Sequence, residues 1–62
     1  MVVNIYHAIS GNLLAKMGAV DSPEKAVLEY AKAFLNEEFK TYSEFVNRNP
    51  LFAMGLIAVP LH

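Results

Sequence analysis

At 62 residues the chain forms one domain at most, and a domain of this size removes only about 60% of its unfolded surface from water. The absence of cysteine excludes disulfides and thiolate zinc sites, so association is the remaining common source of extra stability. Hydrophobic residues make up 55% of the chain, charged residues 18%, and the net charge is −1. This balance excludes intrinsic disorder and gives no basic footprint for nucleic acid or an anionic membrane.

The N-terminal segment has two competing interpretations. A helix over residues 5–17 is predicted, with Asn4 as its cap, Gly18 as its stop and one apolar row formed by Ile5, Ile9, Leu13 and Met17. The triplet at 10–12, Ser-Gly-Asn, argues against this helix because these residues prefer turns. The alternative is a strand over residues 2–7. We favour the helix, because the apolar residues of 5–17 follow a helical rather than an alternating pattern.

A long amphipathic helix is predicted over residues 23–47. Ser22 can accept from the free amides of the first turn, and Pro23 suits the first helical position. The apolar stripe of this helix advances by three or four residues at a time, through Leu28, Ala31, Leu35, Phe39, Tyr42 and Val46. Oppositely charged pairs four residues apart, such as Lys25 with Glu29, support the polar face.

A short third helix is predicted over residues 50–58. Pro50 disfavours helical backbone at Asn49 and so ends the long helix. Asn49 can then serve as the N-cap of a new helix, with Pro50 as its first helical residue. Gly55 weakens this helix and Pro60 ends it. An extended segment from 55 to 61 is the rival interpretation, because Ile57 and Val59 suit a strand.

The predicted fold class is therefore all-α: residues 1–62 form a single helical domain with three helices, completed by oligomerisation. Residues 49–62 contain no charged side chain. A short helix that is apolar on all sides cannot be covered by one neighbour, so a second copy of the chain is expected to cover it, most simply in a twofold dimer. The predicted interface comprises Leu28, Leu35, Phe39, Tyr42, Val46, Leu51, Phe52, Met54, Leu56, Ile57, Val59 and Leu61.

Membrane insertion is disfavoured by the same tail. Its apolar run is about half of the roughly 20 residues that a spanning helix needs, and it contains no lysine or arginine to bind lipid head groups. The first residues contain no basic region of a secretory signal. The expected location is the cytoplasm, and a subunit associated with the membrane interface is the second alternative function.

Candidate catalytic groups are sparse. His7 and His62 are the only side chains that ordinarily titrate near neutral pH, and Ser10 is the only nucleophile near His7. No carboxylate lies within a turn of His7 to orient its ring. Glu37, Glu38 and Glu44 lack the histidine partner of helical metal sites. We therefore predict a protein that is not an enzyme and has no cofactor or metal.

The predicted function is that of a small interaction protein, an accessory protein, inhibitor or adaptor that regulates another macromolecule as a homo-oligomer. Proteins of this class occur in viruses and mobile elements, and the expected partners are a second copy and another protein, not nucleic acid. The first alternative is an oligomer that binds or sequesters a small ligand at a subunit junction. Tyr6, His7 and Asn12 are the predicted contacts of that ligand.

Overall fold

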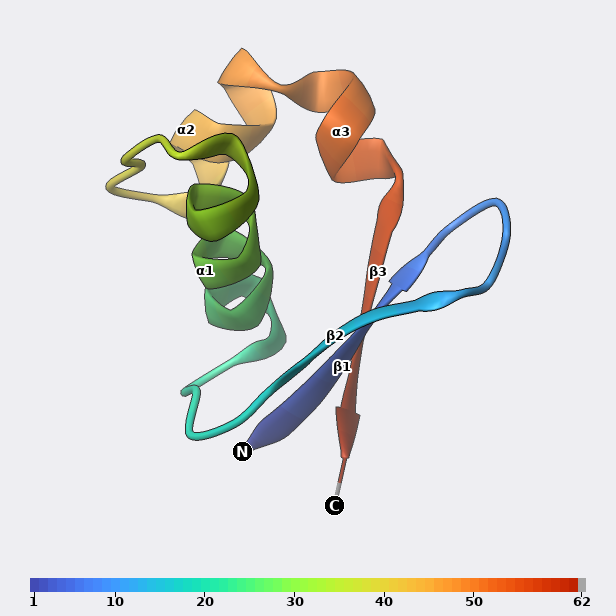
Figure 1. The fold of residues 1–62 in the computed structure, drawn as a ribbon. Helices are drawn as coiled ribbons and strands as arrows, with labels where there is room; N and C mark the ends of the chain where they lie inside the picture. The colour runs from blue at the N-terminus through green and yellow to red at the C-terminus, as the bar shows by residue number, and fades with distance from the viewer. Residues whose placement is uncertain (62) are drawn as a thin grey trace.

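The chain forms an α+β fold in which two strands, three helices and a last strand follow one another. A computed structural model describes residues 1–61 (Figure 1). The elements are β1 (Val2–His7), β2 (Leu13–Met17), α1 (Pro23–Leu35), α2 (Tyr42–Arg48), α3 (Pro50–Met54) and β3 (Leu56–Leu61). The all-α, helical class predicted from the sequence is therefore wrong, because both ends of the chain are extended.

The predicted helix over residues 5–17 is a β-hairpin. Gly11 adopts φ 75°, a left-handed conformation that glycine accepts readily, and the Gly11 N–H donates to the His7 carbonyl (2.8 Å). Ser10-Gly11-Asn12 thus forms the turn that these residues prefer, and the β-branched residues before it enter a strand. The rival strand over residues 2–7 is the one that the chain forms.

The three strands make one antiparallel sheet with β1 in the centre, in the order β2-β1-β3. Val3 pairs with Met17 on one side and with Pro60 on the other, so the first and last strands of the chain are neighbours. The register between β1 and β2 shifts between Ile5 and Tyr6, which places a bulge at Leu14.

The predicted helix over residues 23–47 is divided in two. Its start is where the sequence places it: α1 begins at Pro23, and the Ser22 hydroxyl accepts from the Lys25 N–H (3.1 Å). At the other end Asn36 adopts a left-handed φ of 56°, and α1 stops there. α2 then begins at Tyr42, where the Thr41 hydroxyl caps the Glu44 N–H (3.1 Å). This break allows Phe39 to enter the core.

The predicted helix over residues 50–58 is also too long. α3 begins at Pro50 as the proline pattern indicates, but it ends at Met54. The following residues form β3, because their backbone groups find partners on β1 over a register of six residue pairs. The extended alternative for residues 55–61 is correct at Leu56–Leu61.

The helices pack against one face of the sheet only (Figure 1). Val3 and Ile5 point from β1 to that inner face and are fully buried. They form the core with residues of α1 and with two aromatic rings: Ala26, Val27, Leu28, Ala31, Phe39 and Phe45. Arg48 packs over the Phe39 ring, with its guanidinium 5.3 Å from the ring centre and 2.8 Å from a Glu37 carboxylate oxygen. Among residues 1–61, no helix is long and apolar enough to cross a bilayer.

Phe45 is the residue on which the helical layer depends. It is fully buried, and its ring centre lies 5.4 Å from that of Phe39 and 6.0 Å from that of Phe52. We expect Phe45→Ala to lower the free energy of unfolding by about 3–5 kcal/mol. A domain of this length has roughly 3–9 kcal/mol in total, so much of the variant should be unfolded in water.

Phe34→Ala is the matched control, because the Phe34 side chain is 65% exposed. It should cost less than about 1 kcal/mol in urea unfolding followed by circular dichroism at one fixed protein concentration. Equal losses for the two variants would contradict the described core.

Candidate functional site: an open sheet face and an aromatic groove

The outer face of the sheet is the first candidate surface, and no helix of residues 1–61 covers it. Because side chains alternate along a strand, the neighbours of the buried Val3 and Ile5 point to this side. We call it the open face; it is formed by Val2, Asn4, Tyr6, Leu13, Lys16, Ile57, Val59 and Leu61. Leu13 is 55% exposed, Ile57 48%, and Val59 and Leu61 39% each. Large apolar side chains therefore gather in one continuous patch.

Asn4 lies at the centre of this apolar face, between Lys16 on β2 and Val59 on β3. Its Nδ2 donates to the Tyr6 hydroxyl (3.2 Å). Its Oδ1 is inaccessible to water and has no hydrogen-bond partner among the described residues. A buried amide oxygen without a donor lowers the stability of the folded chain. A molecule that covers the open face could supply a donor to Asn4 Oδ1.

Both edges of the sheet carry features that discourage pairing with another strand. The Ala8 N–H donates to the Gly55 carbonyl (2.8 Å), so Gly55 directs its backbone groups towards β1. Because this direction alternates along an antiparallel strand, the backbone groups of Leu56, Ala58 and Pro60 point to the free edge of β3. Pro60 has no N–H to offer there. The other edge, β2, carries the bulge and the exposed Lys16. Both edges of the sheet are therefore disfavoured as sites of strand pairing.

The second candidate surface is a groove on the helical side, which we call the aromatic groove. It has a volume of about 380 Å³ and is lined by His7, Leu14, Tyr30, Phe34, Leu51, Phe52, Gly55 and Leu56. Its aromatic wall is a stacked cluster: the ring centre of Phe34 lies 5.9 Å from that of Tyr30 and 5.3 Å from that of Phe52. Leu51, 83% exposed, forms part of the rim. Within residues 1–61, no aspartate, glutamate, lysine or arginine lines this groove.

His7 supplies the distinct polar group of the groove. The Ser10 N–H donates to His7 Nδ1 (3.2 Å), so Nδ1 is an acceptor and Nε2 carries the proton of the neutral ring. A Cβ added to Gly55 would lie 4.0 Å from Nε2, so this nitrogen lies beside Gly55, which also lines the groove. The hairpin turn therefore fixes a single N–H donor in apolar surroundings.

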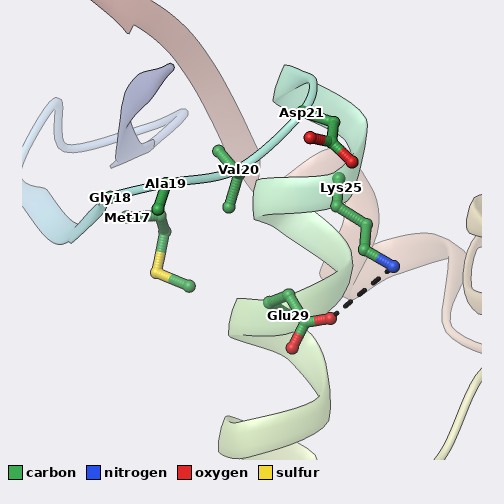
Figure 2. Close-up of a pocket in the computed structure, with 7 residues that line it drawn as sticks. All are labelled: Met17, Gly18, Ala19, Val20, Asp21, Lys25 and Glu29. Carbon is green, nitrogen blue, oxygen red and sulfur yellow. Dashed lines mark ion pairs between the residues drawn. The ribbon is translucent and has the colours of Figure 1, made fainter.

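A second hollow, of about 340 Å³, lies between the 17–21 segment and α1 (Figure 2). Three charged side chains line it, Asp21, Lys25 and Glu29. Lys25 Nζ lies 3.9 Å from a carboxylate oxygen of Glu29, and that oxygen also lies 3.7 Å from Lys32 Nζ, outside the lining. These ions are exposed enough for water to screen them. We see no reacting group in this hollow, and its lining shares nothing with either candidate surface.

The described residues do not assemble a catalytic or metal centre. Ser10 approaches His7 through its backbone N–H, and its hydroxyl accepts from the Asn12 N–H (3.2 Å). A nucleophile and its base need a hydrogen bond between their side chains, which this pair lacks. Glu37 and Glu44 both pair with Arg48. Residues 1–61 contain no cluster of three histidine, aspartate or glutamate side chains; His62 lies outside the described residues.

The predicted interface residues are distributed over three environments. Leu28 and Phe39 belong to the core, with Leu35, Tyr42 and Val46 packed half-buried against it. Leu51, Phe52 and Leu56 line the aromatic groove, beside the exposed Met54. Ile57, Val59 and Leu61 lie on the open face.

The predicted ligand contacts are brought together only in part. The His7 N–H donates to the Asn12 carbonyl across the hairpin (2.9 Å), but the Tyr6 side chain faces the open side, His7 lines the groove and Asn12 is exposed in the turn. Sequence reasoning missed Val2, Asn4, Leu13 and Lys16 on the open face and Leu14, Tyr30, Phe34 and Gly55 in the groove. The alternation of Val3 and Ile5 with Asn4 and Tyr6 was the signal for the open face.

Comparisons of the chain with protein-family models, with curated proteins and with solved structures find no match. A function for the chain is therefore argued from its surfaces.

The orientation of His7 can be measured directly. We expect the neutral ring, observed at alkaline pH, to be the tautomer protonated at Nε2, because Nδ1 accepts the Ser10 N–H. Long-range ¹H–¹⁵N correlation spectra of the ring distinguish the two tautomers. A ring protonated at Nδ1, or a Ser10 amide that exchanges as fast as that of an unstructured loop, would contradict the described turn.

Proposed function

We propose that the chain is a small non-enzymatic interaction protein that acts as a homodimer, in which each copy covers the open face of the other. The observation that carries this proposal is the patch of exposed Leu13, Ile57, Val59 and Leu61 on one side of the sheet. Contiguous apolar patches of several hundred Å² on small proteins mark interaction sites. An antiparallel sheet commonly has one solvated face, but that face is then polar.

The area of the open face suits a second copy. Its side chains expose on the order of 500 Å² per copy, so a dimer would bury on the order of 1,000 Å² in total, which is the lower limit for a specific interface. A second copy brings a pleated apolar surface of the same size, and two sheets pack face to face at about 10 Å. Twofold symmetry is the commonest form of association. We therefore expect a dissociation constant in the micromolar rather than the nanomolar range.

The distribution of charge supports the same arrangement. Among the described residues of the open face, Lys16 alone carries a formal charge, and it lies on an edge strand from which it can extend to the rim of an interface. Twofold packing brings the central strands of the two copies together, and with them the two Asn4 side chains. A rotation of each side-chain amide would bring Oδ1, which is inaccessible in the single chain, to the Nδ2 of the other copy, and this pairing would fix the alignment of the sheets. The aromatic groove stays outside this interface, because it opens on the helical side.

Val59→Lys tests the proposal. Val59 is paired with the central Asn4 and lies on the open face, so twofold symmetry introduces two lysines into the interface. We expect the dimer to weaken by at least about 30-fold, because each charge loses water without gaining a partner. Sedimentation equilibrium over a range of concentrations measures this change, and circular dichroism checks that the variant is folded.

Leu51→Lys is the matched control, because Leu51 is exposed on the opposite side of the sheet. It should leave the dimer unchanged, and the milder Val59→Thr should weaken it less than the lysine does. A wild-type chain that remains monomeric at millimolar concentration would overturn the proposal. So would a dimer that Leu51→Lys dissociates and Val59→Lys does not.

A further inference from the structure

The aromatic groove has the features of a ligand site. It is hollow, its wall is a stacked cluster of Tyr30, Phe34 and Phe52, and it contains an oriented N–H donor at His7. From these features we infer that the groove binds a small apolar molecule that ends in a carboxylate, such as a medium-chain fatty acid. This site goes beyond the proposed dimer, because it lies on the other side of the sheet.

The size of the groove argues for a small molecule rather than a protein helix. A volume of about 380 Å³ corresponds to roughly a dozen water-sized groups. This number suits an unbranched chain of about ten carbons and lies at the lower end of small-molecule sites. A helix is about 10 Å across with its side chains and would rest on the rim without filling the hollow.

The apolar part of the ligand is defined by the walls. Leu14, Leu51 and Leu56 add aliphatic surface to the aromatic cluster. Phe34 is 65% exposed and Leu51 83% exposed, so binding an alkyl chain removes their surface from water without displacing any core contact. The groove therefore supplies hydrophobic binding energy that the folded chain alone leaves unused.

The polar end of the ligand is defined by His7. Because Nδ1 is turned to the Ser10 N–H, Nε2 offers an N–H to the groove, and it remains a donor when the ring is protonated. A carboxylate accepts from such a donor strongly. No acidic side chain among residues 1–61 lines the groove to repel the carboxylate. A quaternary ammonium head group cannot accept a hydrogen bond from the His7 N–H.

The test is an NMR titration with three probes of equal chain length: decanoate and decyltrimethylammonium, each below its micelle concentration, and decanol below its solubility limit. Isotope labelling of the leucine methyl groups follows Leu14, Leu51 and Leu56, and the His7 ring signals follow the donor. We expect decanoate to bind most tightly, with shifts confined to these groups, and decyltrimethylammonium at least about 10-fold more weakly, the effect of one charge-assisted hydrogen bond. Equal affinities for the three probes would overturn the carboxylate assignment.

His7→Phe removes the donor and keeps an aromatic ring. It should weaken decanoate about 10-fold and bring its affinity to that of the ammonium probe. Ile9→Ser is the matched control, because Ile9 is 91% exposed and is not among the lining residues; it should change nothing. Unchanged decanoate binding in a folded His7→Phe variant would overturn the inference.

Gly55→Val tests the position of the site independently of His7. The backbone of Gly55, at φ −80°, accepts a side chain, and that side chain would extend towards His7 Nε2 and occupy the groove. Loss of decanoate binding with an otherwise unchanged amide spectrum supports the site, and full binding contradicts it.

In the Val59→Lys chain, decanoate should bind as in the wild type. The Val59→Lys variant tests the dimer, and the His7→Phe and Gly55→Val variants test the ligand site, so either proposal can be contradicted without the other.

Discussion

The pairing of the last strand with the first is the interaction on which the rest of the structure depends. β3 lies against β1 over the full register from Val2–Leu61 to His7–Leu56, and this places the N-terminal strand at the centre of the sheet. The helices between β2 and β3 are short, and together they cover one face. Among residues 1–61, no helix covers the other face of the sheet. One face of the sheet is therefore packed against helices, and the other leaves apolar side chains exposed.

The formal charges lie in the middle of the chain, outside the paired strands β1 and β3. All eleven formal charges lie between Lys16 and Arg48, so β1 and β3 carry none of them. The helices keep their polar sides in water through local ion pairs such as Arg48 with Glu37. The sheet consequently has two apolar faces, one covered by helices and one open. The aromatic groove forms where the helical cover is thinnest, between α1, α3 and the hairpin. Two surfaces on opposite sides of one thin sheet can then act without competing.

The sequence contained the local signals of this fold but not the choice between helix and strand. The caps at Ser22 and Thr41 and the prolines at 23 and 50 act within a few residues, and the helix starts at Pro23 and Pro50 could be predicted from such signals. The spacing of Ile5, Ile9, Leu13 and Met17 is helical, yet Ile9 lies exposed in a turn. The strands at the two ends of the chain are stabilised by β1–β3 pairing between residues roughly 50 to 60 positions apart, which no local pattern reveals. The break at Asn36 was hidden for a related reason, because it serves the burial of Phe39 and carries no glycine or proline. The apolar tail was recognised as a surface in need of a partner, but its division into groove and open face depends on the strand alternation of Leu56–Leu61.

In the proposed dimer, the open face packs against the open face of a second copy. Isotope-filtered nuclear Overhauser spectra of a mixture of ¹³C-labelled and unlabelled chains test it most directly, since they report only contacts between copies. The proposed dimer predicts contacts from the methyl groups of Ile57 and Val59 in one copy to the Tyr6 ring or Leu13 of the other. Intermolecular contacts that involve Phe34 and Leu51 instead, or none at a concentration at which the protein is dimeric, would contradict it.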